Sequence, residues 1–366
     1  MLVEYFVILL ILLAAAGGFY WLYDRYIRRP RQSESERYVE ALRDLLDGRP
    51  ETAFAKLRQV VAEDSSNIDA YLRLSRILRE HRKPDRALQI DKDLTLRGGL
   101  DSRQRAAILK QLCLDYLALE EFDTAQAALK EMISYDGGNR WAWQTLLRIQ
   151  KHLKQWEEAY DTAAQILKIE GNKSKKPLAV FRYQMGLEQE AKGERRKARV
   201  LFKEALGLDP KFVPAYLATG DSYLAEGRKE DAVNFWNKLI DAVPTEGHQV
   251  IDRLEKVLFD LGRFGDIAGI CQSILRHSPK DRKALLTLAD FHKKKGELDL
   301  AEQRLSAILD DQPHDIAAIL GLLDVYLEQK DLGKIEQAVR RLEDRQPQRP
   351  PSAADDMVDT SLIGIG

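Results

Sequence analysis

The feature that most constrains this chain is an alanine position that recurs at a nearly constant interval along the sequence. Counted from Ala232 in both directions, the position falls on an alanine or an isoleucine nine times. The nine residues are Ala53, Ala87, Ala125, Ala159, Ala198, Ala232, Ile267, Ala301 and Ile335. An interval of this length is typical of arrays in which each unit is a pair of helices and the stacking of neighbouring units provides the core.

Two further positions keep the same period. Twelve residues before the alanine, six of the nine residues are small, as expected where the two helices of one hairpin pack closely. These residues are Ala41, Ser75, Cys113, Leu147, Gly186, Gly220, Glu255, Ala289 and Leu323. Twelve residues after the alanine, every unit except the first has a glycine or a proline, and both residues stop a helix. The pattern therefore predicts nine helical hairpins.

The segment 213–244 carries Gly220, Tyr223, Ala232, Trp236 and Pro244 at spacings that resemble the tetratricopeptide repeat. The resemblance implies an all-α fold, a right-handed α-solenoid of about nine repeats, which we place at residues 35–347. Two intervals, from Ala87 to Ala125 and from Ala159 to Ala198, are longer than the others. We attribute them to longer loops between units, at residues 98–102 and 171–176.

The N-terminus adds a second constraint, because residues 5–23 carry no charge. As a helix they would span about 28 Å, close to the ~30 Å hydrocarbon core of a bilayer. We therefore predict a transmembrane anchor at residues 1–24 and a basic linker at residues 25–34. The alternative is a cleaved signal peptide ending near Ala16, which would make the chain a periplasmic repeat protein. The segment Met1 to Glu4 lacks the basic residues of such a peptide.

The charges around the apolar stretch predict its orientation. Glu4 precedes the stretch and several arginines follow it, so the arginine bias places the repeats in the cytoplasm and the N-terminus outside. Aromatic rings and arginines are both stable at the headgroup level of a membrane. The predicted membrane-interface residues are Trp21, Tyr23, Arg25, Arg28 and Arg29.

The repeat pattern ends at Pro347, and we predict a flexible tail at residues 348–366. Its prolines lack amide donors and its polar residues bury little surface. The last residues, Ser361 to Gly366, are uncharged and partly apolar. They are either a recognition peptide or an ordinary frayed end.

Composition excludes several classes of function. Lys+Arg 57 against Asp+Glu 58 gives a net charge of −1, so the chain lacks the overall positive charge of a dedicated nucleic-acid binder. The six histidines are spread along the repeats and form no HExxH motif. The two cysteines, Cys113 and Cys271, cannot build a four-cysteine zinc site, and we predict buried, unpaired thiols. We expect no metal and no cofactor.

The sequence also lacks the motifs of an enzyme. No glycine-rich phosphate loop follows a strand, and there is neither a Gly-x-Ser-x-Gly turn nor a Cys-His pair that the repeat register would bring together. We predict no catalytic residue and no small-molecule substrate. A helical solenoid commonly binds other proteins along the surface that the first helix of each unit lines.

On that surface, the first helices of units two to four expose mainly basic residues. The candidate partner-binding residues are Arg76, Arg79, Lys110, Trp141, Gln144, Arg148 and Lys151. Guanidinium groups pair with carboxylates and an indole can anchor an interface, so this set predicts binding of an acidic or amide-rich peptide. The alternative is a solvated face of ordinary helices. A second basic cluster, Lys173, Lys175 and Lys176, lies in a loop, where solvation is the simpler interpretation.

The anchor, the linker and the repeats together resemble the lipopolysaccharide assembly protein B family of Gram-negative bacteria. Four blocks carry the resemblance, namely RYVEA at 37–41, PDRALQI at 84–90, QLCLDY at 111–116 and FDTA at 122–125. The likeness covers roughly residues 1–345.

Membership would imply a single-pass protein of the bacterial inner membrane whose repeats face the cytoplasm. The resemblance implies an adaptor that engages a membrane-anchored AAA+ protease and promotes turnover of the lipid A deacetylase. It also implies a link between the synthesis of lipopolysaccharide and its export.

One departure concerns metal binding. The family ordinarily ends in a rubredoxin-like module with paired cysteines, and this sequence has no cysteine after Cys271. The resemblance therefore assigns no metal ligand here. Two interpretations stay open: a shortened branch of the family with altered partner contacts, or a generic membrane-anchored repeat scaffold for another envelope assembly.

Overall fold

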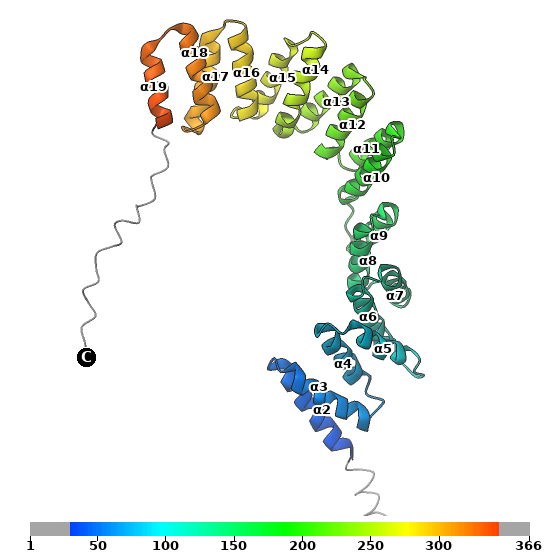
Figure 1. Cartoon of the computed structure of the whole chain (residues 1–366). Coiled ribbons are helices and arrows are strands. Elements are labelled where there is room, and N and C mark those ends of the chain that lie inside the picture. The colour runs from blue at the N-terminus through cyan, green and yellow to red at the C-terminus, as the bar shows by residue number, and fades with distance from the viewer. Residues whose placement is uncertain (1–29, 344–366) are drawn as a thin grey trace, which may run out of the picture. The chain divides into compact units, whose positions relative to one another are not determined.

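The computed structural model describes residues 30–343. Within this range it contains eighteen α-helices, two short 3-10 helices and no strand (Figure 1). Consecutive helices form nine hairpins, as the repeat pattern predicts. The chain divides into two compact units, with the boundary between Lys173 and Ser174.

The first unit contains four hairpins. Their helices are α2 (Pro30–Leu46) with α3 (Pro50–Glu63), α4 (Ile68–Glu80) with α5 (Pro84–Thr95), α6 (Ser102–Ala118) with α7 (Phe122–Tyr135), and α8 (Arg140–His152) with α9 (Trp156–Ile169). The first helix begins inside the stretch that the sequence predicts as a linker.

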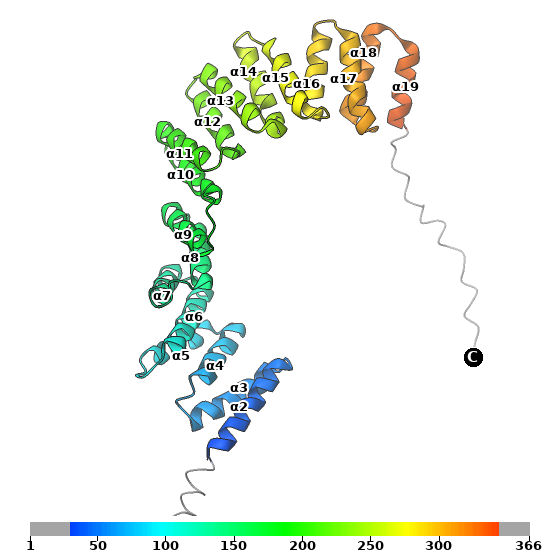
Figure 2. The same ribbon diagram turned by 180° about the vertical axis from the view of Figure 1, so that it is seen from behind.

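The second unit contains five hairpins, whose helices follow one another side by side when seen from behind (Figure 2). They are α10 (Ala179–Ala191) with α11 (Arg195–Leu208), α12 (Val213–Ala225) with α13 (Lys229–Ala242), α14 (Ile251–Asp260) with α15 (Asp266–His277), α16 (Arg282–Lys294) with α17 (Leu298–Asp311), and α18 (Ile316–Gln329) with α19 (Leu332–Glu343). The 3-10 helices η2 (Lys176–Leu178) and η3 (Pro244–Val250) precede α10 and α14.

Each hairpin turn contains one residue in the left-handed region, five positions before the recurring alanine. Five of these residues are glycines, such as Gly227 with φ +74°. The other four are Arg82, Glu120, Lys154 and Lys330, with φ between +56° and +61°. The left-handed residue reverses the chain after the first helix, and its period is hidden in the sequence because four of the nine residues are not glycines.

The recurring alanine lies in the core. Ala53, the first of the series, and Ala301, the eighth, are both 0% exposed. Only the ninth residue, Ile335, is partly exposed. The close-packing position is confirmed most clearly in repeat six, where a Cβ added to Gly220 would overlap the indole of the fully buried Trp236. The helices of this hairpin therefore approach as closely as a glycine allows.

The two long intervals have different structures. At the first, all four additional residues lie in α6, which has 17 residues where α4 has 13. The loop at residues 96–101 is also longer, because α5 ends earlier relative to its alanine than α3 and α7 do. The prediction of a longer loop is therefore only partly right. The reason is a capping box: the Asp101 side chain accepts from the Gln104 amide at 2.7 Å, and the Gln104 side chain accepts from the Asp101 amide at 3.0 Å. At the second, residues 170–175 and η2 do lengthen the connection.

Both cysteines are buried and free, which confirms the prediction. Cys113 lies on α6 and Cys271 on α15, each in a hydrophobic cluster. Burial raises the pKa of each thiol to about 12. Neither thiol is therefore ionised at neutral pH.

The predicted anchor, its interface residues Trp21, Tyr23, Arg25, Arg28 and Arg29, and the predicted tail at 348–366 lie outside the described residues. Among the helices between residues 30 and 343, none combines the length and the apolar character that a membrane span requires.

Candidate partner-binding surface

The candidate surface is built on the first helices of repeats three and four, α6 and α8. Lys110 on α6 and Gln144, Arg148 and Lys151 on α8 are exposed or half-buried, and Trp141 on α8 is half-buried. We call these five residues the basic surface. On α8 they follow one another at intervals of three and four residues, which places Trp141, Gln144, Arg148 and Lys151 along one side of the helix.

Lys110 and Trp141 join the two helices of the basic surface. The Lys110 Nζ atom lies 4.9 Å from the centroid of the Trp141 ring, within the range of a cation–π contact. The indole also packs against the hydrophobic cluster of repeats two to four. An aromatic ring that packs against the core on one side and contacts a cation is a suitable anchor for a partner side chain.

The cations of the basic surface have no acidic partner in the structure. Among residues 36–342, no carboxylate forms an ion pair with Lys110, Arg148 or Lys151. Their charge is therefore available to a ligand, screened only by solvent and salt.

First helices of the second unit differ in part, because several of their basic residues pair with acids of a neighbouring repeat, although Lys256 on α14 has no ion pair among the described residues. Arg253 on α14 binds Asp221 on α12 at 2.8 Å, and Lys293 on α16 binds Asp324 on α18 at 3.0 Å. Lys283 on α16 likewise pairs with Asp252 on α14. Cations that are already paired across repeats offer less to an acidic partner.

Arg76, on α4, lies beside the first repeat and not within the basic surface. Its Nε atom pairs with Glu80 at 2.8 Å, and its side chain is 65% exposed. It lines a pocket of about 670 Å³ between α2 and α4, together with Leu42 and Leu45. This candidate is therefore accessible, but its charge is partly compensated.

The expectation that Arg79 faces solvent is wrong. Its side chain is only 14% exposed, because its guanidinium donates to Asp115 at 2.6 Å and to Gln111 at 2.7 Å, both on α6. Arg79 connects the first helices of repeats two and three. We remove it from the set of residues that can meet a partner.

Asp115 belongs to a buried polar cluster that the repeat register does not predict. Asp91 on α5 and Asp115 on α6 are both 0% exposed, and the Ser75 hydroxyl donates a hydrogen bond to Asp91. Burial, together with the neighbouring Asp115 carboxylate, raises the pKa of Asp91 to about 9. Burial also raises the pKa of Asp115, against the opposing effect of Arg79. Asp91 is therefore protonated at neutral pH, and the ion pair with Arg79 is formed by its neighbour Asp115.

A signal for this cluster exists in the sequence. Ser75 occupies the close-packing position of repeat two, and Asp91 lies four residues after the recurring Ala87, on the helix face that otherwise buries apolar residues. An aspartate on a buried face needs a polar partner. The partners on α6 come from the next repeat, so the period alone does not name them.

The loop lysines Lys173, Lys175 and Lys176 are exposed and lie outside the basic surface. Nothing in the described part of the chain assembles them with an aromatic residue. No group of three or more metal-ligating side chains comes together between residues 30 and 343.

The helices that build the basic surface match known repeat sequences. Two family models, both described as tetratricopeptide repeat, match residues 44–112, 116–175 and 258–323, and residues 183–246. The chain belongs to the tetratricopeptide repeat family. The matched ranges contain every residue of the basic surface.

This tetratricopeptide repeat chain is similar to lipopolysaccharide assembly protein B of Escherichia coli (strain K12), with 24% identity over 73% of this chain and 69% of the relative. It is 27% identical to the protein of the same name from Haemophilus influenzae over 50% of this chain and 46% of the relative. The predicted resemblance to this family is confirmed.

Solved tetratricopeptide repeat structures also match. A tetratricopeptide repeat protein from Parabacteroides merdae ATCC 43184 shares 13% identity with a TM-score of 0.37, covering 85% of this chain and 99% of that one. YrrB, described as a repeat protein with an unusual peptide-binding site, shares 19% identity with a TM-score of 0.31, covering 51% and 92%.

Proposed function

We propose that this protein is a membrane-tethered adaptor that recruits protein partners through the basic surface and has no catalysis of its own. The observation that carries the proposal is the contrast between repeats. Lys110 lies over Trp141, and Arg148 and Lys151 follow on the same helix as the ring, all three without an acidic partner among the described residues. Several first-helix cations of the second unit, such as Arg253 and Lys293, are paired with an acid of a neighbouring repeat. An acidic or amide-rich segment supplies the missing partners.

The biological setting of the proposal rests on similarity to lipopolysaccharide assembly protein B. We place the chain in the regulation of lipopolysaccharide biosynthesis. In this proposal it presents the lipid A deacetylase to a membrane-anchored AAA+ protease, and it links synthesis with export.

The proposed location is the bacterial inner membrane, with residues 1–24 as a single-pass anchor, residues 25–34 as a basic linker, and the repeats of residues 35–347, a right-handed solenoid, facing the cytoplasm. Support comes from the uncharged stretch at 5–23 and the arginines after it. Alkaline phosphatase fused after Gly366 should be inactive in cells. Strong phosphatase activity would contradict this orientation.

The binding proposal is tested with charge reversal. The triple variant Lys110→Glu, Arg148→Glu and Lys151→Glu should lose co-purification with the tagged deacetylase or protease from native membranes, because each change replaces attraction by repulsion. The wild-type interaction should also weaken as salt is raised from about 0.1 M, where the screening length is about 10 Å.

The matched control reverses the same number of charges in the loop, at Lys173, Lys175 and Lys176. This variant should keep its partners. If the loop variant loses them and the basic-surface variant keeps them, the proposed surface is wrong. Helix content by circular dichroism should be equal in both variants, since none of the six side chains is buried.

A separate measurement distinguishes the specific role from a generic scaffold for another envelope assembly. Deleting the gene should lengthen the half-life of the lipid A deacetylase. An unchanged half-life would reject the role in deacetylase turnover and favour the generic scaffold.

A further inference from the structure

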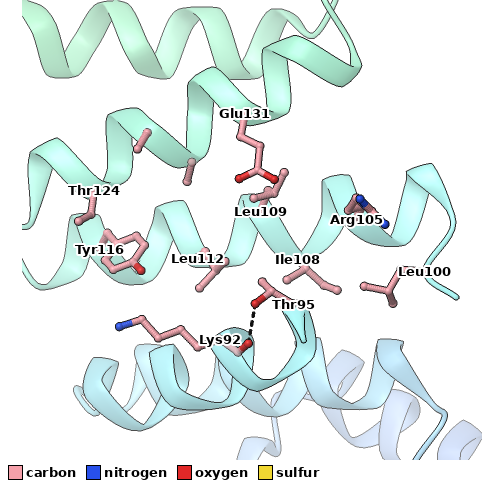
Figure 3. A pocket seen from close by; sticks show the side chains of 12 residues that line it. Lys92, Thr95, Leu100, Arg105, Ile108, Leu109, Leu112, Tyr116, Thr124 and Glu131 are labelled. Atoms are coloured by element: carbon pink, nitrogen blue, oxygen red, sulfur yellow. Dashed lines mark hydrogen bonds between the residues drawn. The ribbon is translucent and has the colours of Figure 1, made fainter. Parts of the chain in front are cut away.

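A trough lies between the second helices α5 and α7, with the first helix α6 as its floor (Figure 3). Its volume is about 520 Å³. The floor is apolar and already largely buried, formed by the core residues Ile108, Leu109 and Leu112, and small exposed side chains such as Ala127 line the α7 wall. A surface with an apolar floor between two helical walls has the shape that an added helix fills.

The extra turn of α6 extends this trough. Arg105 lies in the four residues by which α6 begins earlier than the neighbouring first helices α4 and α8, and it lines one end of the trough together with Leu100 of the preceding loop. In repeat four, where α8 starts at Arg140 without such an extension, the corresponding turn is absent. The insertion in repeat three therefore provides a cation that the repeat pattern does not require.

Two cations stand at opposite ends of the trough. Lys92 on α5 lies with its Nζ atom 5.6 Å from the Tyr116 ring, and the Arg105 guanidinium lies 5.8 Å from the Tyr135 ring. Neither cation pairs with a carboxylate among residues 36–342. Arg105 and Tyr116 are eleven residues apart on one helix, which corresponds to about 16 Å at ~1.5 Å per residue.

The trough is separate from the basic surface. Ile108 and Leu112 each lie two residues from Lys110 on α6, and two residues rotate a side chain by about 200° around a helix. The floor of the trough and Lys110 therefore face opposite sides of α6. A partner in the trough leaves the basic surface free.

We propose that the trough is a second protein-binding surface, and that its partner is an amphipathic helix of another protein with an aliphatic stripe between two acidic residues. The aliphatic stripe packs between the walls, against the exposed Thr95 and Ala127, and the acidic residues meet Lys92 and Arg105. Two residues eleven positions apart on a helix point to the same side, about 16 Å from each other, which matches the rise along α6 from Arg105 to Tyr116, the ring that Lys92 lies beside. Glu131, the one acidic residue in the described part of the chain that lines the trough, favours a basic or amide side chain between them.

With both surfaces occupied, the first unit would hold two partners at once, which is the property an adaptor needs. This inference does not depend on the basic surface. Either surface can fail its test while the other passes.

The test uses the full chain and a fluorescent synthetic helix of about four turns, with glutamates eleven residues apart and leucines on the same face between them. Anisotropy titrations should give a Kd at least about tenfold weaker for the double variant Lys92→Glu and Arg105→Glu, because two attractive contacts become repulsive. Ala127→Trp should weaken binding similarly by filling the trough without changing charge. The triple variant of the basic surface should bind the probe as the wild type does.

The matched control reverses Arg103 and Lys130, which are exposed on α6 and α7 but do not line the trough. This control should bind the probe normally. A probe with lysines in place of the glutamates should bind the Lys92→Glu, Arg105→Glu variant better than the wild type, which excludes a loss through misfolding.

Equal affinity of the double variant and the wild type for the acidic probe would overturn the proposal. So would an equal loss in the Arg103 and Lys130 control, because the effect would then be general charge. Binding of anionic lipid vesicles that depends on Lys92 and Arg105, without binding of the probe helix, would assign the trough to a membrane surface and reject the helical partner.

Discussion

Replacing Asp91 with asparagine should remove most of the pH dependence of the stability of repeats two and three between pH 6 and pH 8. The folded pKa of Asp91, about 9, lies above the ordinary aspartate pKa of 3.8. Between these values the native state holds a proton that the unfolded chain has released. The contribution of Asp91 to stability is therefore largest below about pH 4 and is lost as pH rises toward 9.

The magnitude follows from the number of protons. One proton held only by the native state changes the free energy of unfolding by up to about 1.4 kcal/mol per pH unit. From pH 6 to pH 8 the wild type should lose up to about 3 kcal/mol in this region. Asparagine has the shape of the protonated acid and can still accept from Ser75 and donate to Asp115. The Asp91→Asn variant should therefore be nearly as stable as the wild type at pH 6 and more stable at pH 8.

The assay is hydrogen exchange, because an array of repeats does not unfold in one step. Opening free energies of amides in α4, α5 and α6 are compared at pH 6, 7 and 8 in both proteins after correction for intrinsic exchange rates. His81, whose pKa is raised by the Ile77 carbonyl and by Glu51, contributes a slope of the same sign. Its contribution is present in both proteins and cancels in the difference.

A pH slope in Asp91→Asn equal to that of the wild type would refute the reasoning. The companion variant Asp115→Asn separates the two carboxyl groups. It leaves the Arg79 guanidinium, at 14% exposure, without its carboxylate, so it should destabilise the region by about 3 kcal/mol at every pH. If Asp91→Asn and Asp115→Asn changed the opening free energies by the same amount at each pH, the proton would not be held on Asp91.

Three further predictions concern the core and the turns. Gly220→Ala should destabilise α12 and α13 by about 1–3 kcal/mol in hydrogen exchange, because the new methyl group overlaps the Trp236 side chain. The matched change Gly207→Ala should instead stabilise α11 by up to about 1 kcal/mol, because no atom lies within 4 Å of the new methyl group. Lys154→Gly should raise the thermal midpoint slightly, since φ +56° costs a lysine about 1 kcal/mol; a clear loss of stability would contradict that cost. Both cysteines should resist a thiol reagent in native buffer and react fully in denaturant, and fast labelling of Cys113 in native buffer would contradict its burial.

The fold was predictable because its contacts are local. Each hairpin closes within about one period, so small residues at Ala232 and Gly220 and the prolines between hairpins determine the helices without reference to distant parts of the chain. The buried cysteines follow from the same register. The nine left-handed turn residues were equally periodic, but four of them are not glycines, which hid the pattern.

The candidate site was predictable only in part. The repeat register correctly places Lys110, Trp141 and Arg148 on the first helices, where none of them is buried. It cannot tell an accessible cation from one already bound, because that depends on which side chain of the next repeat reaches it. Arg79 and Arg148 occupy first helices in the same way, yet Arg79 meets Asp115 and Arg148 meets no carboxylate among the described residues.

Sequence alone thus determined the helical hairpins and the face that each residue occupies, since both follow from spacing along one or two helices. The tertiary structure decided which charges are neutralised, where the Asp91 proton resides and where a trough opens. These depend on side chains that meet across repeats, such as Arg79 with Asp115 and Arg253 with Asp221, and on the extra turn of α6. The repeat period determines how the helices are spaced, but it does not determine which acidic side chain pairs with which basic one.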